Sequence, residues 1–164
     1  MKKRWLIMVL LVALLCGCST KSDTQKDDTT ETQEKNIIIN TDYFTLTVPE
    51  SWRGLFEYEV YPDSESYAYT VNLYEIDSHQ EMMGGFLFGI SLYEEDEDIS
   101  YLPSYETIGL LEAKGQTYQV IVEYPTDVQF SDDTAENYQK LSKDMDDVIA
   151  SLEVKEGYTL SQDV

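Results

Sequence analysis

Hydrophobic and polar residues alternate with a period of two along most of the chain after residue 37. In the segment Tyr43–Val48, the side chains of Phe44, Leu46 and Val48 share one face, and the residues between them share the other. The same alternation recurs over residues 56–61, 67–74, 86–93 and 107–124. This pattern is typical of antiparallel strands that bury one face in a core. The sequence therefore predicts a sheet of antiparallel strands.

The alternation also assigns particular side chains to the core. They are every second residue of the predicted strands: Phe44, Leu46, Val48, Phe56, Tyr58, Val60, Tyr67, Tyr69, Val71, Leu73, Phe86, Phe88, Ile90, Leu92, Tyr118, Val120, Val122 and Tyr124. The tyrosines invite a second interpretation, a platform for stacking carbohydrate. Because most of them share the face assigned to the core, we expect packing instead. Gly115 would supply the positive φ of a tight hairpin turn between the last two strands.

One long helix is predicted after the strands. Asp133 is a candidate N-cap, and Glu136 follows three residues later, as in a capping box. Apolar residues then recur at helical spacing: Tyr138, Leu141, Met145, Val148, Ile149 and Leu152. Gly157 would end this helix, and residues 77–83 predict one further helical turn. The expected fold class is α+β, a twisted antiparallel β-sheet with a long C-terminal α-helix packed on it.

The first residues have the pattern of an exported protein. Lys2, Lys3 and Arg4 form a positively charged stub, and residues 5–15 form an apolar run. This run is shorter than the roughly 20 residues that span a bilayer, and it is typical of a secretory signal.

The only two cysteines indicate how this signal is processed. The stretch Leu15-Cys16-Gly17-Cys18 resembles the bacterial lipobox, in which the last cysteine is lipidated. A disulfide between Cys16 and Cys18 would be strained, because bridged cysteines need suitably placed Cα atoms about 4.4–6.8 Å apart. An ordinary cleaved signal with a stray thiol is the alternative. We expect cleavage before Cys18, lipid on its sulfur, and a partner in the lipid bilayer at the extracytoplasmic face of the cell membrane.

The chain is then expected to have four regions. Residues 1–17 are a lipoprotein signal peptide, 18–36 the lipidated cysteine and a disordered tether, 37–157 a single α+β domain, and 158–164 a flexible tail. The tether is predicted because it offers almost no apolar surface to offset the entropy of ordering.

The net charge limits the classes of partner. It is −21 for the whole chain, and it becomes −24 when residues 1–17 are removed, because three basic residues and no acidic ones go with them. Nucleic-acid binding depends on Lys and Arg displacing counterions from phosphates, so we expect no nucleic-acid partner. An envelope protein or a glycan remains a possible partner.

Two resemblances add to this picture. The stretch Tyr43–Trp52, "YFTLTVPESW", resembles the opening of the PsbP/Mog1-like fold. The stretches "GGFLFGISLYEEDE", "LPSYETIG" and "YPTDVQF" are similar to small uncharacterised lipoproteins of clostridia-like Gram-positive bacteria. Together they imply a sandwich of a twisted sheet and a long C-terminal helix. They transfer no catalytic residue.

No motif specifies a reaction. His79 is the only imidazole, and no serine lies in G-x-S-x-G. Hydrolysis of envelope sugars or peptides by two carboxylates stays open as an alternative, since acidic residues are plentiful and such a site needs only a suitably spaced pair. We expect no catalytic residue and no cofactor.

Two acidic runs are candidate calcium ligands, although neither fits the EF-hand loop pattern. Asp96 and Asp98 lie in the run at residues 94–98, and Asp132 and Asp133 precede the predicted helix. The alternatives are solvated loops and favourable charges at a helix N-terminus.

The loop at residues 124–130 is a candidate recognition edge formed by Tyr124, Asp127 and Gln129. Its alternative is a strand end that turns into the helix.

The sequence as a whole therefore predicts a membrane-anchored extracytoplasmic lipoprotein with a non-enzymatic binding or accessory domain. A small carboxylate hydrolase and a calcium-binding surface module are the alternatives.

Overall fold

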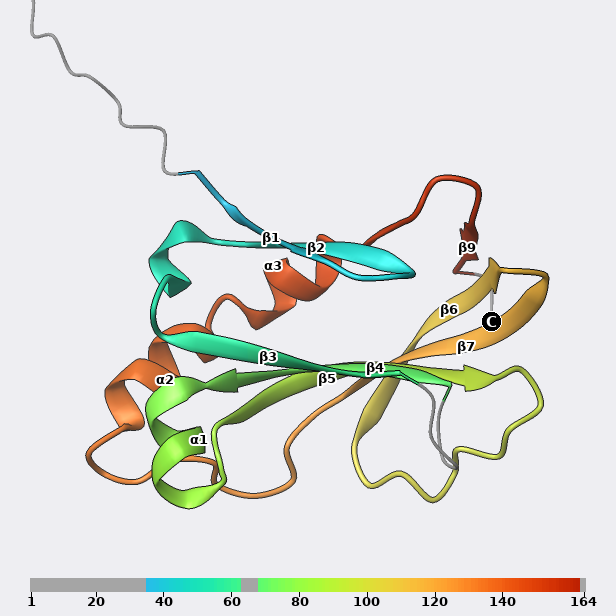
Figure 1. The fold of residues 1–164 in the computed structure, drawn as a ribbon. Coiled ribbons are helices and arrows are strands. Elements are labelled where there is room, and N and C mark those ends of the chain that lie inside the picture. Colours follow the sequence, from blue (N-terminus) through green and yellow to red (C-terminus); the bar gives the residue numbers. More distant parts are fainter. Residues whose placement is uncertain (1–34, 63–67, 163–164) are drawn as a thin grey trace, which may run out of the picture. The chain divides into compact units, whose positions relative to one another are not determined.

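The computed structural model describes residues 35–62 and 68–162 of the chain. The chain divides into two units, residues 1–32 and 33–164, and all described residues lie in the second unit. Within this unit the strands form two separate antiparallel sheets (Figure 1).

The smaller sheet has three strands in the order β1-β2-β8. Its strands are β1 (Ile37–Asn40), β2 (Phe44–Val48) and β8 (Glu153–Val154). The larger sheet has six strands in the order β3-β4-β5-β7-β6-β9. Its strands are β3 (Phe56–Pro62), β4 (Tyr69–Glu75), β5 (Phe86–Glu94), β6 (Tyr105–Ala113), β7 (Gln116–Glu123) and β9 (Thr159–Ser161).

The helices are short and connect or cover the strands. They are the 3-10 turn η1 (Glu50–Trp52) and the α-helices α1 (Ile76–Met82), α2 (Ala135–Ser142) and α3 (Met145–Ala150). Helix α2 packs on β4 and β5, and α3 packs on β2. The fully buried Glu75 begins α1, because its carboxylate accepts the backbone N–H groups of Asp77 (3.1 Å) and Ser78 (2.7 Å).

Strand β5 is buried on both of its faces. On one face, Phe88, Ile90 and Leu92 lie in the main core between the sheets and helices. On the other face, Tyr93 packs with Ile121 of β7 and with Ile99 in a second, smaller cluster. The segment that precedes β6 therefore folds back over the far face of the larger sheet.

A bulge changes which side chains of β5 reach the main core. Leu73 of β4 lies opposite Phe88, but the next pair is Tyr74 opposite Phe86, so Leu87 is an extra residue. Leu87 and Phe88 are both fully buried in the main core, and Phe86 is only half-buried. A bulge of this kind interrupts the alternation of side chains along the strand. Phe86, on the other side of Leu87, therefore does not share the face of Phe88, Ile90 and Leu92 as simple alternation predicts.

The predicted hairpin at residues 113–116 is confirmed. Strands β6 and β7 pair in register from Ala113 and Gln116 outward. Both turn residues have positive φ, 52° at Lys114 and 81° at Gly115. Positive φ at both central positions is the requirement of a type I′ turn, whose twist matches that of the flanking strands. The predicted helical turn at residues 77–83 is also present, as α1.

The predicted fold class is wrong, because no long C-terminal helix packs on one sheet in the described part of the chain. Strands make up 44% of the structure and helices 20%, so the fold is mostly β with two sheets. Helix α2 ends at Ser142 and α3 begins at Met145. Between them Asp144 has φ −101° and ψ 1°, and its Oδ2 accepts the indole N–H of Trp52 at 3.2 Å.

The apolar stripe did not reveal this break because its spacing continues across it. Tyr138 and Leu141 precede the turn and Val148 follows it, and all three are buried. The N-cap also differs from the predicted one, since α2 begins after Thr134 and not after Asp133. The buried indole N–H needs an acceptor, and the turn brings the Asp144 carboxylate to it.

Strand β3 is less buried than the sequence predicts. The alternation predicts Phe56, Tyr58 and Val60 in the core, but Tyr58 is 45% and Val60 is 40% exposed. They lie opposite Leu73 and Val71 of β4, which are fully buried. The side chains thus point to the expected face. Phe56, at the start of β3, packs against the main core beside Trp52, and the core does not extend along the strand to Tyr58 and Val60.

The predicted flexible tail at residues 158–164 is also wrong over its described part. Strand β9 pairs with β6, with Leu160 opposite Leu111. Tyr158 and Leu160 pack against the main core. Gly157 precedes this strand with φ 85°, so it is part of the turn that returns the chain to the sheet.

We expect Asp144→Ala to lower the free energy of unfolding by about 1–3 kcal/mol, because the buried Trp52 N–H would lose its acceptor. Asp144→Asn keeps an acceptor oxygen and should lose less. Urea denaturation measures both values. Asp146→Ala is the matched control, because Asp146 is an exposed aspartate near the same turn. If Asp146→Ala and Asp144→Ala lower the free energy of unfolding equally, Asp144 does not have this role.

Candidate functional site

Four tyrosines and a lysine gather where the β6–β7 turn meets the start of β2. The ring of Tyr43 lies 4.9 Å from that of Tyr69, 5.8 Å from that of Tyr118 and 6.1 Å from that of Tyr158. Lys114 Nζ lies 4.1 Å from the centre of the Tyr43 ring. This is a cation–π contact, and it covers the aromatic cluster with a positive charge.

These tyrosines are part of the interior. Tyr43, Tyr69 and Tyr118 are all buried, and the ring of Tyr43 meets the other two in edge-to-face contacts, so their ring faces are closed to a ligand. Burial, followed by the contact with Tyr43, raises the pKa of Tyr118 to about 12. Its hydroxyl donates to the side-chain oxygen of Gln116 at 2.6 Å. The expectation of core packing is therefore confirmed for Tyr69 and Tyr118, whereas Tyr43 is buried although the alternation put it on the opposite face.

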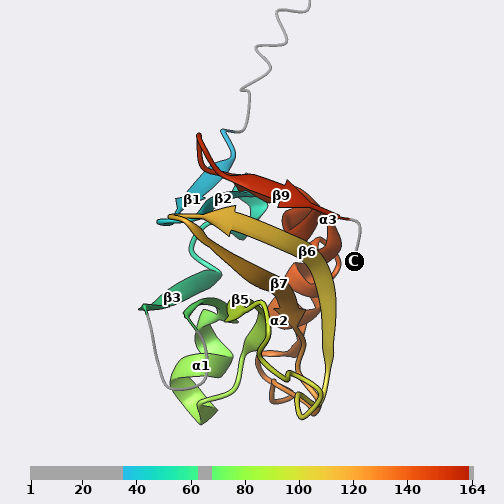
Figure 2. The same ribbon diagram turned by 90° about the vertical axis from the view of Figure 1, so that its right-hand side faces the viewer.

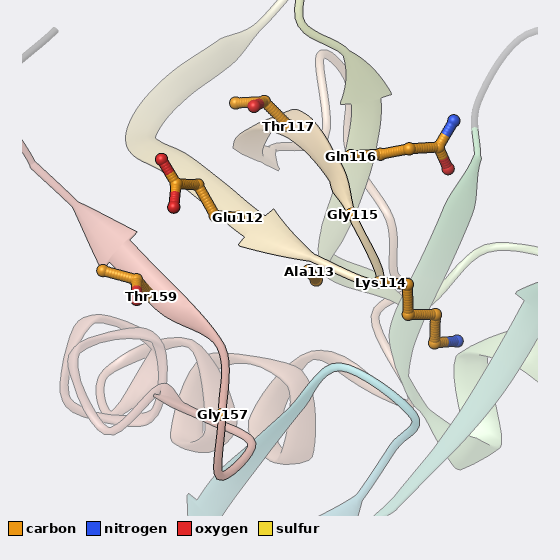
Figure 3. A pocket seen from close by; sticks show the side chains of 8 residues that line it. All are labelled: Glu112, Ala113, Lys114, Gly115, Gln116, Thr117, Gly157 and Thr159. Atoms are coloured by element: carbon orange, nitrogen blue, oxygen red, sulfur yellow. The ribbon is translucent and has the colours of Figure 1, made fainter.

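A shallow depression of about 370 Å³ lies beside the same turn. Figure 3 shows Glu112, Thr117 and Thr159 on three adjacent strands, with Lys114 and Gln116 directed to the other side of the turn. Glu112 is opposite Thr117 on β7 and opposite Thr159 on β9. These cross-strand neighbours form a polar row that can accept and donate hydrogen bonds at an open surface.

A second depression of about 380 Å³ shares Gln116 and Thr117 with the first. Its wall carries Glu94, Glu95 and Asp96 at the end of β5. The two depressions thus flank the start of β7. Both linings are largely polar, with one carboxylate and Lys114 in the first depression and three carboxylates in the second. The second therefore suits hydroxyl or cationic groups better than anions.

His79 is held against the face of the larger sheet that lies away from the main core. Its ring stacks on Tyr74 with centroids 4.1 Å apart and planes 6° apart. Its Nδ1 lies 2.6 Å from Glu57 Oε1 on β3. These contacts tie α1 to β3 and β4, so the imidazole is engaged in joining three elements.

Ser91 has a carboxylate partner, but it has no access to solvent. It is fully buried, and its Oγ donates to Glu123 Oε1 at 2.6 Å and lies 2.8 Å from Thr70 Oγ1. The neighbouring Tyr93 has a raised pKa, first because it is buried and then because Glu123 is close. This network stabilises the packing of β4, β5 and β7, and a substrate would have to open it to reach Ser91.

Among the described residues, two carboxyl groups have shifted pKa values, and both are shifted downward. Glu50 has a lowered pKa because its side chain bonds with Arg53. Asp98 has a lowered pKa because Ser100 donates to it, and the backbone N–H of Ser100 lies 3.0 Å from Asp98 Oδ1. Both are held as carboxylates, which is the opposite of what a general acid requires.

The residues of the predicted recognition edge are near one another but serve the loop itself. Gln129 accepts the backbone N–H of Phe86 through its side chain at 3.3 Å and that of Gly85 through its carbonyl at 2.7 Å. Its amide group also bonds to Asp127. The Tyr124 hydroxyl donates to Glu106 at 3.1 Å. These contacts fix the chain between β7 and α2, which supports the alternative, a strand end that turns into a helix.

The candidate metal ligands lie on exposed loops. Asp96 and Asp98 belong to the loop after β5, and Asp132 and Asp133 belong to the loop before α2. Within residues 35–62 and 68–162, no three His, Cys, Asp or Glu side chains come together in a way that could hold a metal ion. Asp98 instead bonds to Ser100 at the start of the turn over the second cluster.

Cys18, the residue predicted for lipidation, and the lipobox residues Leu15, Cys16 and Gly17 lie outside the described residues. None of the helices described for this chain is long and apolar enough to cross a membrane. Searches against protein-family models, curated proteins and solved structures found no match to this chain. The resemblance to small clostridial lipoproteins therefore stays a prediction.

The cluster around Tyr43 and the two depressions were missed from the sequence. Their residues come from positions as far apart as Tyr43 and Thr159, and no local spacing links them. One signal was present, because a hairpin turn with Lys114 before Gly115 places a cation at a defined sheet end. Nothing in the sequence showed which aromatic ring it would meet.

We expect stability to fall as the pH rises from 10 to about 12, partly because of Tyr118. Below pH 10 both the folded and the unfolded chain keep this proton. Between pH 10 and about 12 the unfolded chain loses it first, so it binds fewer protons than the folded chain, and unfolding becomes more favourable. One pKa unit corresponds to about 1.4 kcal/mol. The free energy of unfolding of Tyr118→Phe should therefore fall by roughly 1–3 kcal/mol less over this pH range than that of the unmodified chain.

Urea denaturation at several pH values, together with the phenolate absorbance of the folded protein, tests this expectation. Tyr101→Phe is the control, since Tyr101 is 59% exposed. If Tyr118→Phe and Tyr101→Phe flatten the pH profile equally, burial of Tyr118 is not the cause.

We expect the melting temperature to be the same in millimolar calcium and in EDTA, within about 1 °C. A ligand stabilises a protein only by binding the folded state more tightly, and the described acidic side chains do not converge. Differential scanning calorimetry measures the effect, with magnesium as the matched divalent ion. A rise of several degrees in calcium that disappears in Asp96→Asn or Asp98→Asn would restore the calcium hypothesis.

Proposed function

We propose that this chain is a lipid-anchored extracytoplasmic lipoprotein whose folded domain is a non-enzymatic binding module. The observation that carries the proposal is the stretch Leu15-Cys16-Gly17-Cys18 directly after a positive stub and a short apolar run. A thioether-linked diacylglyceryl group on Cys18 provides two acyl chains, which is the number that stable anchoring takes.

The segment between the anchor and the domain supports the same proposal. Residues 19–36 are polar and charged, and the first strand begins at Ile37. Fully extended, a segment of this length reaches about 60 Å at roughly 3.3 Å per residue. A domain attached in this way has freedom to meet partners near the membrane surface.

The state of the chemically capable side chains favours binding over catalysis. His79 is paired with Glu57 and stacked on Tyr74, and Ser91 is fully buried in a satisfied network. Two polar depressions beside the β6–β7 turn are accessible, and one of them carries three carboxylates. Such a surface offers charge and hydrogen bonds to a partner without an activated nucleophile.

Cys18→Ala tests the anchor in a Gram-positive host that processes lipoproteins. We expect this variant to lose incorporation of an alkyne-labelled palmitate and to leave the membrane fraction, because no acyl chains are attached. Cys16→Ala is the matched control, since Cys16 would be removed with the signal, and it should keep both the label and the membrane association. Immunoblots of washed membranes and culture medium measure the distribution. Retention and labelling of Cys18→Ala at the level of the unmodified chain would overturn the proposed anchor.

A further inference from the structure

Strand β3 forms one edge of the six-stranded sheet and carries exposed apolar residues. It pairs with β4 on one side, and among the described residues no strand pairs with its other side. Figure 2 shows β3 at the left-hand margin of the view, away from β6 and β7. Tyr58, Val60 and Tyr61 are 45%, 40% and 37% exposed. An exposed edge of this length is a template for another strand.

The register shows which backbone groups this edge offers. The backbone N–H of Ile76 donates to Leu55 just before β3, and paired residues alternate in an antiparallel ladder. Residues 57, 59 and 61 therefore direct their N–H and C=O groups toward β4, and residues 56, 58 and 60 direct theirs to the free edge. Pro62, which has no N–H, falls on an outward position and costs the β3–β4 ladder no bond.

The two faces of β3 differ in chemistry. Tyr58 and Val60 continue the apolar face of the sheet beyond the buried Leu73 and Val71. Glu57 and Glu59 lie on the opposite face. The carboxylate of Glu59 accepts a hydrogen bond from the hydroxyl of Tyr61, and this neutral donor leaves the negative charge of Glu59 uncompensated. Glu57 lies against His79, and 40% of its side chain is exposed.

These glutamates disfavour a second copy of the chain as the occupant of the edge. In an antiparallel pair of two β3 strands centred on Tyr58, Glu57 of each copy would lie opposite Glu59 of the other. Shifting the centre by one residue places Glu57 opposite Glu57 or Glu59 opposite Glu59. Like charges directly opposite each other destabilise a strand pair, and the net charge of −21 adds long-range repulsion.

We propose that β3 binds an extended, positively charged segment of a partner polypeptide as an additional strand. The segment would bond to the outward backbone groups of Tyr58 and Val60. Its apolar residues would cover these two side chains, and its Lys or Arg residues would lie beside Glu57 and Glu59. This is strand addition, in which the main chain supplies affinity and alternate side chains supply specificity. The proposal names the partner class of the binding module and so rests on the proposed function.

The test uses the full chain, purified in neutral detergent. The probe is the peptide acetyl-Lys-Val-Lys-Val-Lys-Val-Lys-amide, followed by fluorescence anisotropy of an attached dye. The matched probe has the same sequence with N-methyl groups on alternate residues, so it keeps the charge and loses the hydrogen-bond donors. Hydrogen–deuterium exchange of the bound protein then locates the contact.

Two variants with the same change in net charge separate local from general attraction. Glu59→Lys changes the proposed edge, and Glu156→Lys changes an exposed glutamate outside the sheets. We expect binding to weaken at least about tenfold in Glu59→Lys and with the N-methylated peptide, and to change less than about twofold in Glu156→Lys. Exchange at residues 56–61 should slow at least about tenfold at saturation.

The proposal is overturned if both peptides bind equally, since the attraction is then only that of charge. It is also overturned if the peptide does not bind at millimolar concentration, or if sedimentation shows that the chain dimerises and protects β3 by itself. Anchoring through Cys18 is measured separately. If the chain stays in the membrane fraction but does not bind the peptide, the proposal of strand addition fails and the proposed anchor stands.

Discussion

The burial of β5 on both faces is the constraint on which the rest of the structure depends. A strand in the middle of an antiparallel sheet needs cover only on one face, but this strand carries apolar side chains on both. The smaller sheet and helices α2 and α3 cover one face, and the segment around Ile99 covers the other. The cover is centred on β4, β5 and β7, and the outermost strand β3 extends beyond it with Tyr58 and Val60 exposed.

The same constraint explains why the C-terminal part is not one helix. A single straight helix would follow one axis, whereas α2 has to reach β4 and β5 and α3 has to reach β2. The turn at Asp144 changes the direction between them, and its carboxylate accepts the buried indole N–H of Trp52. Residues after α3 then supply one strand to each sheet, β8 to the smaller and β9 to the larger. The C-terminal segment therefore ties both sheets together.

The sequence predicted the elements better than their arrangement. Alternation located β2, β4, β6 and β7, and the pair Lys114-Gly115 located the hairpin turn, because these signals are local in sequence. Alternation does not report whether a neighbouring layer extends far enough to cover a strand, so it could not show that β3 is exposed. Helical spacing likewise continues across the turn at Asp144, because Leu141 and Val148 face the same core on both sides of it. The four tyrosines of the cluster around Tyr43 come from segments far apart in the sequence, and only the folded chain brings them together beside Lys114.

The distribution of charge links the proposed edge to the proposed location. An acidic domain held near a membrane by its N-terminus is repelled by anionic lipid headgroups, and this repulsion falls off within about 8–10 Å at physiological salt. Copies of the domain repel one another in the same way, and Glu57 and Glu59 add this repulsion at the strand where self-pairing would otherwise be easiest. The bonds offered by the edge of β3 are general to any strand, but the charges beside them are not. A partner segment rich in Lys or Arg gains from both features, whereas an acidic segment gains only the main-chain bonds and meets two glutamates. The selectivity of this edge would therefore come from charge, and its affinity from the main chain and from the apolar surface of Tyr58 and Val60.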